Sequence, residues 1–209
     1  MPQFFSRSRL RILGIFLAIL TGLSLGHAAA SYITPSAAVT RIGASVQARP
    51  LDVVCVGAGA QTILIVGGIH TGMERVTTTL AEQIAAQLAT GELSVTAAVR
   101  LCVILLLNPD GLALGQRTNG NDVDLNRNWP TANWWTHAFH SQDGSVEAGA
   151  QPLSESETRA LFDYALGTHP AVLLVLHCCG GLVEANEAPA AAQVGQVYAA
   201  ATGLGYIEE

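Results

Sequence analysis

The chain has 209 residues, of which 50% are hydrophobic and only 12% are charged. This composition excludes an intrinsically disordered protein, which combines low hydrophobicity with high net charge. All ten basic residues are Arg, and 16 acidic residues give a formal net charge of −6 at pH 7. This charge balance argues against a nucleic-acid-binding protein, which carries basic patches. A chain of this length can form one domain with a substantial core.

The first 30 residues have the layout of a secretory signal peptide. Three Arg residues precede an uncharged apolar run at residues 12–25, and positions 28–30 are Ala, an A-x-A cleavage pattern. The run is shorter than the roughly 20 residues of a membrane-spanning helix, although a retained anchor is the alternative. We therefore expect residues 1–30 to be removed, and residues 31–209 to form a secreted or periplasmic domain that does not contact the membrane.

Apolar runs and helical periodicity alternate along the rest of the chain. Four short apolar runs predict buried strands, at residues 51–56, 62–66, 99–107 and 171–176. Apolar residues at helical spacing predict three helices, at residues 74–88, 154–167 and 190–202. Ser154 and Glu157 have the spacing of a capping box at the start of the second helix. This alternation is typical of an α/β fold with a mixed, largely parallel sheet flanked by helices.

Side chains that can bind metal follow two of the predicted strands. His70 comes after the strand at 62–66, Glu74 begins the next helix, and His177 closes the strand at 171–176. Ligand sites in such sheets lie beyond the carboxyl ends of the strands, so the three residues can meet there. Two imidazoles and one carboxylate can hold zinc and leave a fourth position for water, whose pKa zinc lowers to about 7. The alternative is a chance His–Glu pair without metal.

A polar stretch rich in Asn, Asp and Gly, residues 108–151, separates the two His residues. A loop of this length inside a compact domain is usually functional. Asp124 can accept a hydrogen bond from the distal nitrogen of a metal-bound His. Arg117 and Arg127 bring fixed donor forks that suit carboxylates and developing oxyanions. The alternative is a plain loop whose surface arginines form weak ion pairs.

Several motifs, in this order, resemble the zinc carboxypeptidases of the M14 type, the carboxypeptidase A and T group. They are Gly67-Gly68-Ile69-His70, Asn108-Pro109-Asp110-Gly111, the run from Arg117 to Trp129 with its Asp-x-Asn-Arg-Asn core, residues 154–161, and His177. The resemblance covers residues 42–206, so it implies that residues 31–209 are a partial catalytic domain of this family with its mixed α/β fold.

The resemblance implies that one zinc ion binds His70, Glu74 and His177, the ligand set of two His and one Glu known for carboxypeptidase A. It also implies that Asp124 orients His70. The family usually places two residues between its first His and the Glu, whereas three residues separate His70 from Glu74 here. One extra residue can be absorbed in a turn that contains Gly72.

The resemblance further implies that Arg117 stabilises the oxyanion of the reaction, and that Asn126 and Arg127 bind the free carboxylate of a substrate's C-terminal residue. These roles describe a metallocarboxypeptidase that removes C-terminal residues from peptides, cell-wall peptides among them. Two alternatives stay open. One is a zinc amidase or deacylase of N-acyl amino acids, whose substrates also carry a carboxylate; the other is a non-catalytic protein that binds zinc or peptide.

The family has a Tyr and a catalytic Glu, its general base, well downstream of the last zinc ligand. Here 32 residues follow His177, and Glu208 and Glu209 lie where the family has an early strand, so neither is assigned this role. We therefore expect an incomplete copy of the catalytic domain, without the C-terminal strands of the sheet.

Four cysteines occur in two different settings. Cys55 and Cys102 lie in predicted strands, which favours small buried hydrophobic side chains. Cys178 and Cys179 directly follow His177, and burial is favoured there over a metal or redox role. Disulfides are permitted in an exported chain, but the spacing does not determine which cysteines pair.

Overall fold

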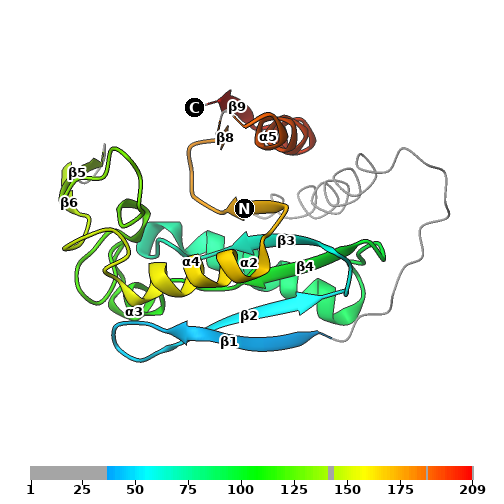
Figure 1. Cartoon of the computed structure of the whole chain (residues 1–209), viewed down its shortest axis with the longest axis horizontal. Helices are drawn as coiled ribbons and strands as arrows, with labels where there is room; N and C mark the ends of the chain where they lie inside the picture. Colours follow the sequence, from blue (N-terminus) through cyan, green and yellow to red (C-terminus); the bar gives the residue numbers. More distant parts are fainter. Residues whose placement is uncertain (1–36, 141–143, 187, 209) are drawn as a thin grey trace, which may run out of the picture.

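The structure is a computed structural model that describes residues 37–140, 144–186 and 188–208; the expected signal peptide lies outside the described residues. Its centre is a five-stranded sheet with the order β1-β2-β4-β3-β7 (Figure 1). In chain order these strands are β1 (Ala38–Ala44), β2 (Pro50–Val56), β3 (Gln61–Val66), β4 (Val99–Ile104) and β7 (Val172–Val175).

The sheet is mixed, as predicted, but it is not largely parallel. β1 pairs with β2 and β2 with β4 in antiparallel fashion, whereas β4 with β3 and β3 with β7 are parallel. The difference originates partly at β1, a strand that the sequence did not predict. Only residues 45–49 separate β1 from β2. A connection this short can join antiparallel strands only, because a parallel crossover needs a dozen residues or more.

Helices lie against both faces of this sheet and also outside it. They are α2 (Arg75–Thr90), α3 (Pro109–Leu114), α4 (Ser156–Thr168) and α5 (Pro189–Thr202), with two short 3-10 turns, η1 (Gly72–Glu74) and η2 (Leu125–Arg127). The three helices predicted from periodicity correspond to α2, α4 and α5. None of the described helices is long and apolar enough to cross a membrane.

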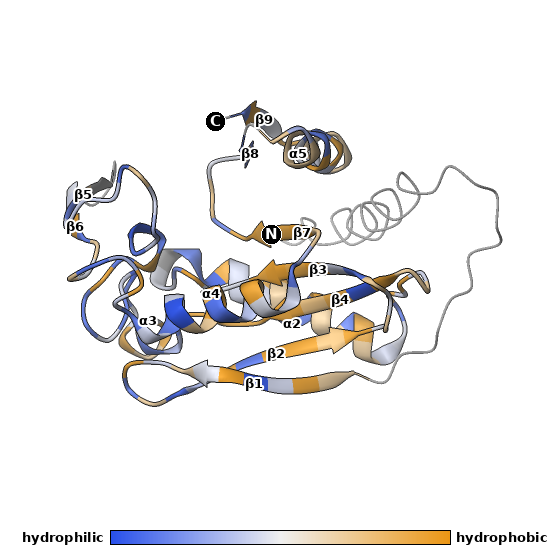
Figure 2. Ribbon diagram, viewed as in Figure 1, coloured by the Kyte–Doolittle hydropathy of each residue, from blue (hydrophilic) through white to orange (hydrophobic). Residues whose placement is uncertain are grey.

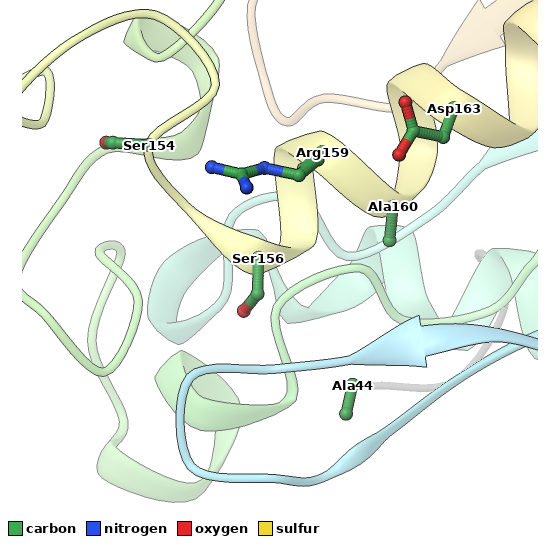
Figure 3. A pocket seen from close by; sticks show the side chains of 6 residues that line it. All are labelled: Ala44, Ser154, Ser156, Arg159, Ala160 and Asp163. Carbon is green, nitrogen blue, oxygen red and sulfur yellow. The ribbon is translucent and has the colours of Figure 1, made fainter.

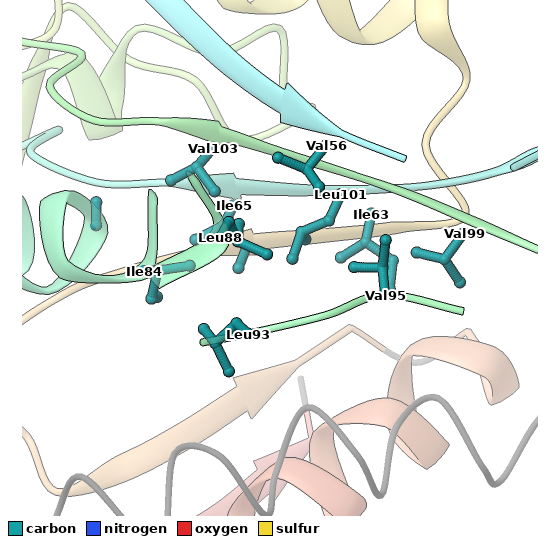
Figure 4. Packing of buried hydrophobic residues seen from close by; sticks show 11 residues of the cluster. Val56, Ile63, Ile65, Ile84, Leu88, Leu93, Val95, Val99, Leu101 and Val103 are labelled. Atoms are coloured by element: carbon teal, nitrogen blue, oxygen red, sulfur yellow. The ribbon is translucent and has the colours of Figure 1, made fainter. Parts of the chain in front are cut away.

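Side chains of β3 alternate between two buried clusters, one on each face of the sheet. Ile63 and Ile65 pack on the α2 side (Figure 4). Leu64 and Val66 pack on the other side, together with Leu161 of α4. Because both faces are buried, residues 63–66 form a continuous hydrophobic run. Figure 2 shows that the central strands are apolar and that the stretch following β4 is more polar.

The capping box predicted at the start of α4 is wrong. The N-cap residue is Glu155, and its side chain makes no capping hydrogen bond. Ser154 instead donates to the Glu155 carboxylate over 2.7 Å and accepts from the buried Asn128 amide over 2.9 Å. The Ser154 hydroxyl therefore serves the preceding loop and not the helix terminus.

Two smaller sheets lie outside the central one. The antiparallel pair β5 (His137–His140) and β6 (Gly144–Glu147) belongs to the long polar stretch. The parallel pair β8 (Leu182–Ala185) and β9 (Gly205–Glu208) is connected by α5. Figure 1 shows β8, α5 and β9 together, beyond the β7 edge of the central sheet. Within the described residues β7 has a partner strand on one side only, and its side chains Leu173 and Val175 are exposed.

The structure also answers which of the strand cysteines pair. Cys55 on β2 and Cys102 on β4 lie directly opposite each other in the antiparallel register and form a disulfide. Both side chains are buried, as predicted. The hydroxyl of Tyr164, on α4, contacts both sulfur atoms.

Candidate metal centre and active site

Two parallel neighbours bring the predicted histidines together. β3 and β7 run side by side, with Val66 opposite Val175, and His70 and His177 follow the ends of these strands. The two imidazole ring centres are 4.9 Å apart. His70 is buried and His177 is exposed, so the pair extends from the protein interior to the surface.

Glu74 completes the cluster from the turn that follows His70. It is the last residue of η1, which begins at Gly72 with a φ of +65°, a conformation that glycine adopts without strain. Its Oε1 lies 3.1 Å from His70 Nδ1, and its Oε2 lies 3.4 Å from His177 Nδ1. One ligand atom from each of the three residues lies within 4.8 Å of the other two. The extra residue between His70 and Glu74 is therefore absorbed in the turn.

Asp124 lies on the opposite side of the His70 ring. His70 Nε2 and Asp124 Oδ1 are 2.8 Å apart, and both side chains are fully buried. Asp124 also caps η2, since its Oδ1 accepts the backbone N–H of Asn126 over 2.9 Å. With Nε2 engaged by this carboxylate, His70 presents Nδ1 to the cluster, the arrangement found for metal-binding histidines.

Arg117 forms hydrogen bonds with the carboxylates of both Glu74 and Asp124. Its Nη1 donates to Glu74 Oε1 over 2.6 Å, and its Nε donates to Asp124 Oδ2 over 3.1 Å. The guanidinium is partly exposed, which places a fixed positive charge at the solvent side of the site. A positive charge in this position can stabilise negative charge that develops on a substrate oxygen.

Burial and hydrogen bonding act in opposite directions on the ionisable groups. Burial alone would raise the pKa of Glu74, but hydrogen bonds with His177, His70 and the Cys178 N–H hold that pKa far below its usual value. The pKa of Asp124 is likewise held low against burial by His70 and Arg117. Burial lowers the pKa of His70, but its bonds to Asp124 and Glu74 outweigh burial and raise it. The carboxylates of Glu74 and Asp124 therefore both favour the ionised form.

Asn126 and Arg127, the predicted carboxylate-binding residues, form η2 next to Asp124 and are half-buried. Arg127 Nη1 donates to the backbone oxygen of Asn126 over 3.1 Å. No hydrogen bond between described residues joins these two side chains to the three clustered residues. The structure thus places them on the segment that carries Asp124.

Two features of the site were not predicted. The backbone N–H of Cys178 donates to Glu74 Oε2 over 3.0 Å, so the chain after β7 also fixes the Glu74 carboxylate. The clustered metal-ligand group does not include Cys178 or Cys179. A backbone donor leaves no signal in the sequence, because any residue except proline supplies one.

The second unpredicted feature is how the polar stretch is held in place. Asn119 and Asn128 are fully buried. Asn119 Nδ2 donates to the Glu155 carboxylate over 2.8 Å, and Asn128 Nδ2 donates to the backbone oxygens of Ala148 and Gln151 over 2.7 and 3.0 Å. Composition alone cannot separate such buried amides from solvated ones, so they were read as ordinary loop residues.

A surface pocket of about 340 Å³ lies elsewhere, between β1 and α4 (Figure 3). Its lining residues are Ala44, Ser154, Ser156, Arg159, Ala160 and Asp163. None of them belongs to the His–Glu–His cluster, and the hydroxyls of Ser154 and Ser156 already donate to glutamates of the same segment. The pocket therefore has no part in the metal centre.

Comparison with known protein families finds one match over most of the chain. The profile of the zinc carboxypeptidases, peptidase M14, matches residues 28–183. Murein peptide amidase A from Escherichia coli K12 is 42% identical over 83 residues, and its counterpart from Vibrio campbellii is 36% identical over 83 residues. Each match covers 36% of this chain, and the chain spans 34% of the length of these curated relatives.

Solved structures agree with this comparison. The murein-tripeptide amidase from Escherichia coli O157 has a TM-score of 0.63 at 29% identity, covering 82% of this chain and 73% of that chain. Carboxypeptidase A from Helicoverpa armigera has a TM-score of 0.67 at 17% identity, covering 97% of this chain and 64% of that chain. At this lower identity the likeness shows the fold alone.

Proposed function

Because the chain belongs to the zinc carboxypeptidase family, peptidase M14, we propose that it is part of a zinc-dependent hydrolase of peptide-type amide bonds acting on murein peptides. The observation that supports this proposal most directly is that His70 and Glu74, after β3, and His177, after β7, bring their ligand atoms within 4.8 Å of one another. Two imidazoles and a carboxylate are the donor set of a catalytic zinc site with an open fourth position.

The arrangement of the three residues fits such an ion. Their ligand atoms face one another, and the Nε2 of His70 is occupied by Asp124, which leaves Nδ1 as its metal-binding atom. Zinc, when bound, acts as a Lewis acid that polarises a carbonyl and lowers the pKa of water. Because His177 is exposed, the substrate would approach from that side.

Other side chains would orient His70, stabilise negative charge and bind the substrate. Asp124 holds the ring of His70 in one orientation. Arg117, which is already next to the cluster, would stabilise the negative charge on the carbonyl oxygen of the bond being cleaved. Asn126 and Arg127 would bind a terminal carboxylate. A substrate without that carboxylate would leave these donors unpaired, so the site would select chain ends.

Murein peptides are favoured over ordinary C-terminal peptide substrates by the degree of likeness. The curated amidases are 36–42% identical to this chain over 83 residues, and the solved amidase is 29% identical over 82% of the chain. The Helicoverpa armigera carboxypeptidase is 17% identical over 97% of the chain. A metallocarboxypeptidase of ordinary peptides is the second candidate, supported by the family and the same site.

Product analysis would separate the two candidates. Zinc-loaded protein should hydrolyse an amide bond of a murein tripeptide and leave a peptide of ordinary L-residues intact, as measured by mass spectrometry of the products. Release of the C-terminal residue from ordinary peptides alone would favour the carboxypeptidase. Hydrolysis of neither, with zinc bound, would contradict the proposed activity for this chain.

We also propose that the protein is exported. The proposal is supported by the signal-like residues 1–30 and by the Cys55–Cys102 disulfide, since such bonds persist in oxidising compartments. The mass of the protein recovered from the cell envelope or medium should match a chain that begins at about Ser31. Recovery of the uncleaved chain from the cytosol with both cysteines reduced would contradict export.

A further inference from the structure

We propose that Asn108 and Thr71 are positioning residues for Arg117, a role that rests on the proposed function of Arg117 in hydrolysis. Both side chains are buried, and neither belongs to the His–Glu–His cluster. They bond to the backbone on both sides of Arg117 and thereby determine where its guanidinium can reach.

The contacts cover three consecutive carbonyl oxygens. Thr71 Oγ1 donates to the oxygen of Gln116 over 2.6 Å. Asn108 Nδ2 donates to the oxygens of Arg117 and Thr118, each over 3.1 Å. A loop without regular secondary structure has no internal hydrogen-bond ladder, so these side-chain donors replace one.

Asn108 is itself held rigidly. Its Oδ1 accepts the N–H of Gly111 over 2.8 Å, which caps α3, and its own N–H donates to Gly68 over 2.9 Å. Thr71 directly follows His70. Asn108 is thus hydrogen-bonded to the segment between β3 and His70, and Thr71 directly continues that segment. The backbone around Arg117 is therefore held in place relative to the segment that carries His70.

Gly111 leaves room for this convergence. A Cβ at position 111 would collide with the oxygen of Thr118, the amide nitrogen of Asn108 and the hydroxyl of Thr71. All three groups therefore pack against one Cα. The Asn-Pro-Asp-Gly segment supplies both the donor and the space that the donor needs.

These contacts fix the position of the backbone from which the long Arg117 side chain extends. Arg117 reaches Glu74 and Asp124 at the same time, which requires its backbone to stay within a narrow range. A misplacement of about 1 Å can lower a rate about 100-fold when the geometry of a stabilising group is at stake. Loss of either donor should therefore lower kcat more than it raises KM.

The first test compares two substitutions of Thr71 in the full chain. Thr71→Val removes the hydroxyl while keeping the shape, and Thr71→Ser keeps the hydroxyl. We expect Thr71→Val to lower kcat about tenfold with KM changed by less than about threefold. Thr71→Ser should restore kcat to within about threefold of the wild type, because the donor to Gln116 is retained.

The second test compares two buried asparagines. Asn108→Asp removes the donor to Arg117 and Thr118, and Asn128→Asp removes an equivalent donor to two backbone oxygens that are not adjacent to Arg117. Asn108→Asp should lower kcat about 10- to 100-fold, whereas Asn128→Asp should keep kcat within about threefold. Both variants are expected to unfold at lower temperature, so stability alone does not distinguish them.

Two readouts do not depend on catalysis. Zinc affinity should stay within about threefold of the wild type in all four variants, since the cluster is untouched. The Nε–H resonance of Arg117 in nuclear magnetic resonance spectra should shift in Thr71→Val and Asn108→Asp, and not in Thr71→Ser or Asn128→Asp.

The proposal is overturned if Thr71→Val and Asn108→Asp leave kcat and the Arg117 resonance unchanged. It is equally overturned if Asn128→Asp lowers kcat as much as Asn108→Asp, because both residues would then act through stability alone. If the zinc-loaded wild type hydrolyses no peptide, the proposed function fails, and the Arg117 resonance still decides whether these residues position the side chain.

Discussion

His70 and Asp124 lie 54 positions apart in the sequence, yet His70 Nε2 and Asp124 Oδ1 are 2.8 Å apart, with both side chains fully buried. This contact ties the end of β3 to the polar stretch and fixes which nitrogen of His70 faces Glu74. Together with the hydrogen bond from Arg117 to Glu74, it connects the polar stretch to the His–Glu–His cluster.

Asp124→Asn should weaken zinc binding about 10- to 100-fold, as expected for loss of a carboxylate that orients a metal-bound His. Competition with a chromophoric chelator measures this affinity. Asp52→Asn, on β2 and outside the cluster, is the matched control and should bind zinc like the wild type. Equal affinity of Asp124→Asn and the control would show that Asp124 does not support the site.

Replacing any one of the three clustered residues should remove the ion. His70→Ala, Glu74→Ala and His177→Ala are each expected to reduce the zinc content of purified protein from about one to near zero per chain, because three protein ligands are the usual minimum of a catalytic zinc site. His137→Ala is the control, since His137 is exposed and pairs with Glu147 outside the cluster. Full zinc content in Glu74→Ala would remove Glu74 from the ligand set.

Asp110 should contribute a pH-dependent part of the stability. Burial raises its pKa, but hydrogen bonds from Ser45, the Gln47 N–H and Arg49 outweigh burial and hold the pKa below its usual value. The folded state therefore binds this proton less readily than the unfolded state, so Asp110 stabilises the fold above its unfolded pKa of about 3.9. That stabilisation is lost as the pH falls through the lower, folded pKa.

Denaturant unfolding of the wild type and Asp110→Asn across pH 3 to 7 measures this effect. The wild type should have the higher free energy of unfolding at pH 7. Its difference from Asp110→Asn should narrow as the pH falls below about 4. A difference that stays constant down to pH 3 would contradict a lowered pKa for Asp110.

The Cys55–Cys102 disulfide should stabilise the sheet. Cys55→Ala combined with Cys102→Ala is expected to lower the free energy of unfolding by about 2–5 kcal/mol, the usual cost of removing a native disulfide. Denaturant unfolding with and without dithiothreitol measures it, and the reductant should destabilise the wild type more than the double variant. Free thiols at Cys55 and Cys102 in unfolded, unreduced wild-type protein would contradict the disulfide.

The sequence predicted that His70, Glu74 and His177 come together, and the structure confirms this proximity. The prediction was possible because the ends of buried strands can be recognised from the local sequence pattern. Buried strands are apolar throughout, so their ends are visible, and polar side chains such as His70 and His177 that follow them stand out. Parallel neighbours then place such residues at one edge of the sheet. That β3 and β7 are direct neighbours in the sheet was not predicted from the sequence.

Other parts of the fold carried no such signal. β1 is mostly exposed, so it lacks the apolar run that revealed its neighbours. The Ser154 capping box failed because Asn128, 26 residues earlier, competes for the same hydroxyl. Asn108 and Asn119 belong to motifs that the resemblance identified, but their full burial and the backbone contacts by which they hold the loop were not predicted. Contacts of this kind depend on tertiary structure, which local composition does not encode.

The most direct test of the account is X-ray absorption spectroscopy at the zinc edge on the purified, zinc-loaded protein. We predict one zinc per chain with only nitrogen and oxygen ligands, at about 2.0–2.2 Å, from His70, Glu74 and His177. Loss of this spectrum in Glu74→Ala, with the fold retained, would assign the oxygen. A shell of sulfur at about 2.3 Å, from Cys178 or Cys179, or a protein that retains no zinc, would contradict the proposed metal centre.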